Sequence, residues 1–114
     1  MSVKLTTRQV GDVTVIDAVG RITLGEGAST FRDTVRTLAS SGHKKMLLNL
    51  GEVSYIDSSG IGEMVSGFTT VANQGGAVKL LNLTKRVKDL LQITKLYTVF
   101  EVFDDEATAV RSFS

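Results

Sequence analysis

The chain has 114 residues, of which 42% are hydrophobic, and this is enough to build a core without a disulfide or a metal. It contains no cysteine and one histidine, which excludes a disulfide framework, a thiolate nucleophile and a metal site built from these residue types. Thirteen basic and twelve acidic residues give a net charge of +1, which offers no overall field for nucleic acid or an anionic membrane.

The distribution of residues predicts a single domain over residues 1–114. Proline is absent, and the eleven glycines leave no candidate linker between domains. The first residues lack the apolar core of a signal peptide, and no apolar run approaches the roughly 20 residues that span a bilayer. We therefore expect a cytoplasmic protein that does not enter a membrane.

The first twenty residues predict a β-hairpin. Residues 3–10 and 13–19 alternate, imperfectly, between apolar and polar side chains. Gly11-Asp12 lies between them and supplies a two-residue turn. Two antiparallel strands are expected here.

A helix is predicted after the hairpin. Thr23-Leu24-Gly25-Glu26 matches a capping box, and Phe31, Val35 and Leu38 lie on one helical stripe. Gly42 is a typical stop signal. Thr23 and Glu26 are explained either by capping or by contact with a partner, and the pattern leaves both open.

The stretch 53–65 is predicted to hold the functional loop. Before it, residues 46–50 form a nearly unbroken apolar run, typical of a strand covered on both faces in a parallel sheet. A small polar turn around Asp57 then leads directly into a helical pattern that Gly75-Gly76 closes. Its apolar stripe consists of Ile61, Met64, Val65, Phe68, Val71 and Ala72.

Three further elements are predicted in the last third of the chain. Residues 78–83 form another apolar run, and Thr84 caps a shorter helix whose inward residues are Val87, Leu90 and Leu91. Residues 99–103 predict a last strand, and the acidic residues 104–106 suit the first turn of a terminal helix. Strands alternating with helices predict an α/β fold with a mostly parallel sheet, to which the hairpin adds antiparallel character.

The Asp57 turn lies at the N-terminus of a helix, where unpaired N–H groups and the helix dipole favour a carboxylate or a phosphate. Two serines, Ser58 and Ser59, lie there. Asp57 itself is either a simple cap or a functional residue. Gly60 and Gly62 each cost the helix about 1 kcal/mol relative to alanine. They either admit a partner's surface or allow close packing against the sheet.

No catalytic constellation is apparent, so we expect a protein that is not an enzyme. A nucleophile elbow would need glycine at position 56 or 57, where Ile56 and Asp57 stand. His43 is the one candidate base, and it lies in a predicted solvated turn at the opposite end of the buried strand. Gly60-Ile61-Gly62 lacks the lysine and the length of a phosphate-binding Walker loop.

Five basic residues form a local cluster in the second half of the chain: Lys79, Lys85, Arg86, Lys88 and Lys95. Such a cluster is compatible with a nucleic-acid or phospholipid site. The absence of interleaved stacking aromatics and the small net charge favour a solvated helix face instead. The sequence therefore predicts no cofactor, no metal and no nucleic-acid partner.

The sequence Asp-Ser-Ser-Gly-Ile-Gly at residues 57–62, placed after an apolar strand, resembles the anti-sigma-factor antagonist family, whose domains are also called STAS. The resemblance implies a mixed four- to five-stranded sheet flanked by about four helices, with the serine loop exposed at the start of the second. It also implies that a partner protein kinase phosphorylates the serine after the aspartate, which is Ser58. One departure is that Arg21 stands where family members often have an acidic residue, so the partner's identity stays open.

The function implied is an antagonist that, when unphosphorylated, sequesters an anti-sigma factor that is also a serine kinase, in a partner-switching pathway regulating transcription. A phosphoserine phosphatase would be a second partner. The alternative is a STAS scaffold, or a ligand- or nucleotide-binding subunit, of a larger signalling complex. Because helix starts after parallel strands share one end of a sheet, we expect the partner to contact both such loops. The expected partner-binding residues are Thr23, Gly25, Glu26, Ser29, Asp57, Ser58, Ser59, Gly60, Ile61, Gly62 and Glu63.

Overall fold

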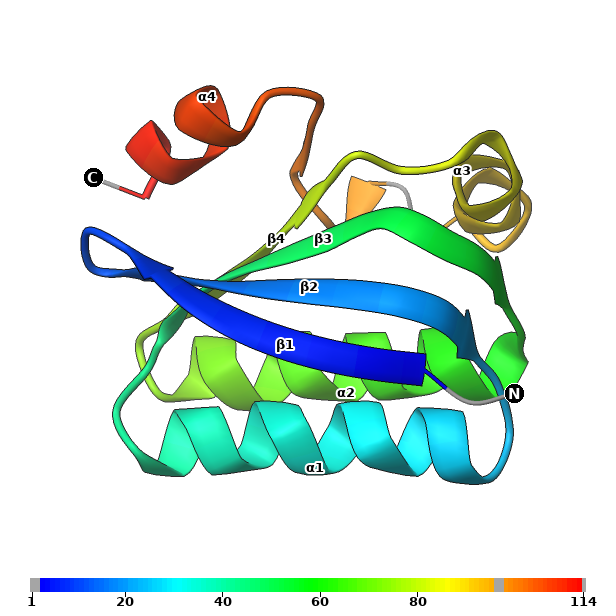
Figure 1. Cartoon of the computed structure of the whole chain (residues 1–114), viewed down its shortest axis with the longest axis horizontal. Coiled ribbons are helices and arrows are strands. Elements are labelled where there is room, and N and C mark those ends of the chain that lie inside the picture. Colours follow the sequence, from blue (N-terminus) through cyan, green and yellow to red (C-terminus); the bar gives the residue numbers. More distant parts are fainter. Residues whose placement is uncertain (1–2, 96–97, 114) are drawn as a thin grey trace.

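The structure is a computed structural model that describes residues 3–95 and 98–113 (Figure 1). Its elements are β1 (Val3–Val10), β2 (Val13–Ile22), α1 (Glu26–Ser40), β3 (Lys45–Ile56), α2 (Ser58–Asn73), β4 (Ala77–Leu81), α3 (Lys85–Ile93), β5 (Val102–Phe103) and α4 (Glu106–Arg111). The strands form one sheet in the order β1-β2-β3-β4-β5. β1 and β2 are antiparallel, and each later pair is parallel. The predicted α/β fold with a mixed sheet is confirmed.

The predicted hairpin is present. Val10 pairs with Val13, which leaves the two-residue turn Gly11-Asp12 between the strands. β2 continues three residues beyond its predicted end, to Ile22, because its second half pairs with β3. This extension carries the chain to the same end of the sheet as the start of α2.

Helices cover the sheet on both faces (Figure 1). α1 and α2 lie side by side on one face, and α3 and α4 lie on the other. Phe31 of α1 and Met64 of α2 pack into the larger core cluster with strand residues such as Leu48. On the opposite face, Ala109 of α4 packs into a smaller cluster with strand residues such as Leu47. The alternation of side chains along β3 thus supplies both layers.

The inward stripe predicted for the second helix is confirmed at five of its six positions. Ile61, Met64 and Val71 are buried, and Val65 and Phe68 are partly buried against the same core. Ala72 is exposed, so the prediction is wrong there. The first two helices end where predicted, before Gly42 and Gly75.

The third strand is longer than its apolar run. Residues 53–56, which were predicted to be loop, belong to β3 instead. β3 continues to Ile56, which pairs with Ile22 of β2. Beyond Asn49, β3 pairs with β2 alone, because the pairing with β4 ends there. Polar residues are tolerated where one side of β3 is unpaired. The pairing with β2 shifts register twice there, between Asp17 and Val19 and between Gly20 and Arg21, and each shift leaves an extra residue in β3. The turn before α2 therefore shrinks to Asp57.

The end of the chain follows the predicted order with shorter strands. β4 ends at Leu81 rather than residue 83, and β5 has two residues rather than five. Phe100 leaves the sheet to pack its ring edge-on against Phe68, with 5.3 Å between centroids. Thr84 caps α3 as predicted, since its hydroxyl accepts from the N–H of Val87.

Candidate functional site

Asp57 joins the two loops at the carboxyl end of the parallel strands. It is the N-cap of α2, and its Oδ1 accepts a hydrogen bond from the N–H of Gly60 at 2.9 Å. Its Oδ2 accepts from the N–H of Leu24, in the loop between β2 and α1, at 2.8 Å. The capping interpretation of Asp57 is confirmed, and the same carboxylate also fixes the neighbouring loop.

These backbone donors lower the pKa of the Asp57 carboxyl, the N–H of Leu24 most and the N–H of Gly60 next. Hydrogen bonds to the charged form of a carboxyl favour that form, as does the positive end of a helix dipole. Asp57 is therefore ionised at neutral pH. Any further negative group at the start of α2 has to share the site with this charge.

The two serines differ in accessibility. Ser58 is the first residue of α2 and is exposed, whereas Ser59 is partly buried. Ser58 follows Asp57 directly, and Ser59 comes next; the carboxylate bonds the N–H of Gly60, and Ser58 stays exposed. Ser58 is the more accessible hydroxyl for a reaction at this end of the molecule.

The two glycines of the first helical turn have different surroundings. A Cβ on Gly60 would lie 2.1 Å from the carbonyl oxygen of Ile22 and 2.8 Å from Cγ2 of Ile56. Close packing against the sheet therefore explains Gly60. Gly62 is exposed, and a Cβ there would meet nothing within 4 Å. Packing does not account for Gly62.

The predicted capping box in the loop between β2 and α1 is wrong. The N-cap of α1 is Gly25, and no side chain caps the helix. Gly25 has a φ of 96°, which a residue with a side chain rarely adopts, and Thr23 bonds the N–H of Ala28 through its carbonyl rather than through its side chain. The helix begins at Glu26 instead, and the side chain of Glu26 is exposed at its first turn.

The structure brings the predicted partner-binding residues together at one end of the sheet, but not all of them reach the surface. Gly60 and Ile61 are buried, so they support the loop from beneath. Glu63 is partly buried, and its Oε2 lies 3.6 Å from a guanidinium nitrogen of Arg32 on α1. The members that are exposed or partly exposed are Thr23, Gly25, Glu26, Ser29, Asp57, Ser58, Ser59, Gly62 and Glu63.

Leu24 belongs to this surface and lies within the loop 23–29 that we expect the partner to contact, but the sequence does not single it out. Its side chain is 79% exposed, and its N–H is the donor that Asp57 holds. A leucine between a threonine and a glycine carries no periodic signal, so the pattern did not single it out. The predicted capping box also placed Leu24 in the first turn of the helix, whereas α1 begins at Glu26.

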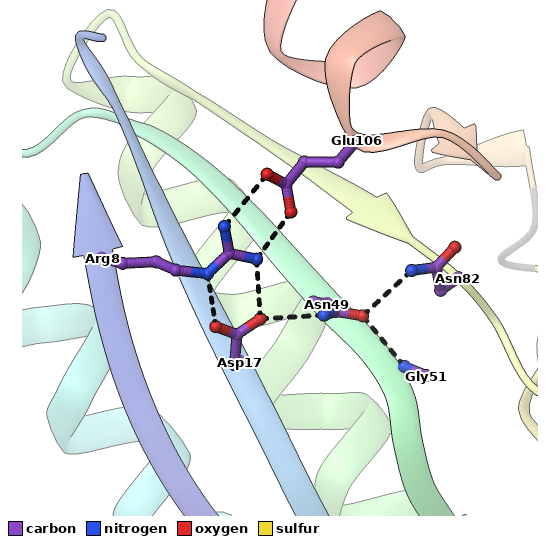
Figure 2. Close-up of polar contacts among 6 residues, drawn as sticks. All are labelled: Arg8, Asp17, Asn49, Gly51, Asn82 and Glu106. Atoms are coloured by element: carbon purple, nitrogen blue, oxygen red, sulfur yellow. Dashed lines mark hydrogen bonds and ion pairs between the residues drawn. The ribbon is translucent and has the colours of Figure 1, made fainter. Parts of the chain in front are cut away.

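A second polar network crosses the opposite half of the molecule, on the sheet face that α3 and α4 cover (Figure 2). Arg8 of β1 bonds Asp17 of β2 through Nε (2.7 Å) and Glu106 of α4 through both terminal nitrogens (2.6 and 3.0 Å). Asn49 of β3 donates to Asp17 at 2.8 Å and accepts from Asn82 at 3.4 Å. We call Arg8, Asp17, Asn49, Asn82 and Glu106 the polar ladder.

The other residues singled out from the sequence lie away from Ser58. His43 lies at the amino end of β3, as expected, with its Nδ1 3.2 Å from the hydroxyl of Thr14. Lys79 of the basic cluster is buried, so a solvated helix face is the wrong interpretation for it. Its Nζ bonds the carbonyl and hydroxyl oxygens of Ser112 and pairs with Glu101, each at 2.9 Å.

A groove of about 470 Å³ lies between α3 and the end of β3. It is lined by Tyr55, Lys85, Arg86, Asp89, Leu90 and Ile93. The guanidinium of Arg86 lies 5.5 Å from the centroid of the Tyr55 ring, and Lys85 pairs with Asp89. The aromatic and charged groups of the groove therefore engage one another.

Within residues 3–95 and 98–113, no cluster of histidine, cysteine and carboxylate side chains could hold a metal ion. No helix of the same residues is long and apolar enough to cross a membrane.

Comparisons with known proteins agree with this geometry. The family model for the STAS domain matches residues 4–109. The anti-sigma-B factor antagonist of Bacillus subtilis (strain 168) is 31% identical over 102 residues, which cover 90% of this chain and 92% of that protein. Such antagonists are typically non-enzymatic.

Solved structures share the fold. The Thermotoga maritima protein TM1081 superposes with a TM-score of 0.89 at 24% identity, over 96% of this chain and 93% of that one. The Bacillus cell fate determinant SpoIIAA in its phosphorylated form superposes with a TM-score of 0.76 at 19% identity, over 97% and 100%. With the family match and the relative from Bacillus subtilis, these findings show that the chain belongs to the STAS domain family of anti-sigma factor antagonists.

Proposed function

We propose that this antagonist is switched by phosphorylation of Ser58. In the unphosphorylated form it sequesters an anti-sigma factor that is also a serine kinase, and a phosphoserine phosphatase restores that form. The observation that carries the proposal is the exposed hydroxyl of Ser58 at the start of α2, next to the capping carboxylate of Asp57. A structural relative, SpoIIAA, is known in a phosphorylated form, which supports the same chemistry here.

In the free protein, phosphate on Ser58 is tolerated. It adds a charge of about −1.5 to −2 at neutral pH. The group projects into water from a helix N-terminus, where the dipole favours it by roughly 0.3–1 kcal/mol. Repulsion from the ionised Asp57 opposes this gain, and solvent screens the repulsion. We therefore expect the fold and the stability of the free domain to change little.

In a complex the same phosphate is costly. The partner's surface would be shaped for a neutral hydroxyl beside one carboxylate, and burying a dianion there costs several kcal/mol through desolvation and repulsion. About 2.8 kcal/mol is enough for a hundredfold loss of affinity. Phosphate thus acts by exclusion at the interface, and no refolding is required.

The proposed interface is the exposed part of the predicted residues at the two helix starts. Glu26 and Ser58 are exposed there, and Gly62 presents backbone with no side chain to block a close approach. This surface lies at the carboxyl ends of β2 and β3, where α/β folds place their sites. We further propose that the protein acts in the cytoplasm, where such a partner and the transcription machinery would be found.

The phosphoacceptor is tested with small histidine-kinase-like ATPases of the host, purified one at a time and incubated with this protein and ATP. Peptide mapping by mass spectrometry should place phosphate on Ser58. Phosphate chiefly on Ser59 would contradict the assignment. Failure of every such kinase to bind or modify the protein would favour the alternative of a scaffold or ligand-binding subunit.

The switch is tested by calorimetry with the same kinase. Ser58→Ala should bind with an affinity close to that of the parent and stay bound in the presence of ATP. Ser58→Asp should bind more weakly, though less so than the phosphoprotein, because it carries one charge and a shorter reach. Equal affinities for the two variants, or a large structural change in the free phosphoprotein, would overturn the proposed mechanism.

A further inference from the structure

Leu24 is an exposed apolar residue whose backbone N–H bonds Asp57, the residue before the proposed phosphoacceptor. It is 79% exposed, on the loop between β2 and α1. Single exposed apolar residues are common and need no explanation by themselves. Ile93 on α3 is exposed to the same degree, 77%, so exposure alone does not distinguish Leu24.

The distinguishing feature of Leu24 is that its backbone is fixed. Its N–H donates to Oδ2 of Asp57 at 2.8 Å, a charge-assisted bond to an ionised carboxylate. The chain on either side is held as well, because the N–H of Ala28 bonds the carbonyl of Thr23 at 2.9 Å and the N–H of Ser29 bonds that of Gly25 at 3.0 Å. The loop therefore presents the leucine in one backbone conformation.

Rigid presentation of an apolar side chain favours binding. Association costs free energy for each flexible group that has to be ordered, so an anchor on a preorganised loop loses less than one on a mobile loop. Apolar anchors that fill a pocket commonly dominate an interface. Leu24 and Ser58 are tied to the same residue, one through a hydrogen bond and the other through the chain. A surface that receives the hydroxyl of Ser58 therefore lies close to the backbone of Leu24.

We propose that Leu24 is the apolar anchor for the kinase partner, and that Asp57 is a positioning residue that sets its place relative to Ser58. The inference rests on the proposed function and deepens it. The partner is an anti-sigma factor kinase with an apolar pocket beside its active-site cleft. Phosphate on Ser58 then puts a dianion at the rim of that pocket, where water has been excluded.

The two hydrogen bonds of Asp57 can be separated by substitution. Asp57→Ser keeps one oxygen at the N-cap, so the N–H of Gly60 still has an acceptor and the helix keeps its start. The single hydroxyl cannot also reach Leu24, so the loop loses its tether. Leu24→Ala keeps the tether and removes the anchor. Ile93→Ala is the matched control for loss of an equally exposed apolar side chain on α3.

The experiment is a double-mutant cycle measured by calorimetry, with the kinase that binds the parent chain as the probe. Leu24→Ala and Asp57→Ser should each weaken binding about tenfold or more, as expected for an anchor residue. The double variant should lose less affinity than the product of the two single losses, because part of the effect of Asp57 acts through Leu24. Ile93→Ala should bind like the parent. Hydrogen exchange of the free Asp57→Ser variant should show faster exchange at Leu24 and retained protection at Gly60.

The outcomes separate the inference from the function on which it rests. If the parent binds the kinase and Leu24→Ala binds equally well, the anchor is refuted while the switch stands. If the losses of the two single variants multiply in the double variant, Asp57 acts only through its own contact with the partner and its positioning role is refuted. A larger loss in Ile93→Ala than in Leu24→Ala would place the interface elsewhere. Failure of the parent to bind any such kinase would overturn both proposals.

Discussion

Asp57 and Asp17 both have a carboxyl group with a lowered pKa. Asp57 lies in the turn between β3 and α2, and Asp17 lies within β2. The pKa of Asp57 is lowered chiefly by the backbone N–H of Leu24. The pKa of Asp17 is lowered chiefly by the guanidinium of Arg8, with a further contribution from the side chain of Asn49. Asp57 borders an exposed serine and an exposed leucine, whereas Asp17 is 26% exposed inside the polar ladder (Figure 2).

A lowered carboxyl pKa therefore does not by itself mark a functional site. Perturbed pKa values arise in structural ion-pair networks as well as in reactive sites. Asp57 differs from Asp17 because its carboxylate holds the loop between β2 and α1, on which Leu24 is exposed. The hydrogen bonds of Asp17 go to side chains of the neighbouring strands, Arg8 of β1 and Asn49 of β3, and they hold no exposed loop in place. The two regions should therefore respond differently to substitution.

The largest expected effect comes from close packing beneath the Asp57 turn. Gly60→Ala would place a Cβ 2.1 Å from the carbonyl oxygen of Ile22, so the start of α2 has to move away from β2. We expect a loss of about 3 kcal/mol in the free energy of unfolding. Urea denaturation would measure it. A loss below about 1 kcal/mol would mean that the turn can shift freely, and would weaken the view of a rigid site.

The polar ladder should affect stability without affecting binding. Arg8→Met keeps the apolar part of the side chain and leaves Asp17 and Glu106 facing each other without their shared cation. Because Arg8 and Glu106 are well solvated, we expect a loss of only about 1 kcal/mol in the free energy of unfolding. Glu106→Gln should cost less. Affinity for the kinase should match that of the parent in both variants, and a tenfold change would join the two regions functionally.

The pH dependence of stability should separate the ladder from the rest of the protein. Arg8 lowers the pKa of both Asp17 and Glu106, so the folded state favours their charged forms. This contribution is fully present above the unfolded pKa values, about 4, and is lost as pH falls through the lower folded values. The stability difference between the parent and Arg8→Met should stay constant from pH 7 to about 5 and shrink below about 4. A difference unchanged at pH 3 would show that Arg8 does not stabilise the fold through the charged forms of Asp17 and Glu106.

Much of the fold is predictable from the sequence because it follows a repeating pattern. The hairpin, the inward face of α2 and the caps at Asp57 and Thr84 depend on residues close together in the chain. The ladder is not predictable in this way, since Arg8 and Glu106 are 98 positions apart and neither belongs to a motif. The burial of Lys79 is likewise set by Ser112 and Glu101 from other elements.

The candidate site likewise contains one feature that the local sequence predicts and one that depends on residues far apart in the chain. Ser58 follows from a local motif, and its exposure agrees with the role proposed for it. The tether between Asp57 and Leu24 joins two loops 33 residues apart through a backbone N–H, which every residue except proline possesses. No residue type at position 24 would have signalled it. Sequence patterns therefore point to the reactive group, and the structure is needed to find the groups beside it.

The smallest expected effect is at Gly62, where stability and binding should change in opposite directions. A Cβ at this position meets nothing within 4 Å, so Gly62→Ala costs no packing. Alanine is the better helix former, and we expect a gain of up to about 1 kcal/mol in the free energy of unfolding. If Gly62 lets the kinase approach the backbone beside Ser58, the same variant should bind it more weakly. Measured together by urea denaturation and calorimetry, higher stability with unchanged affinity would leave Gly62 without a role at the interface, because neither packing nor partner contact would then require it.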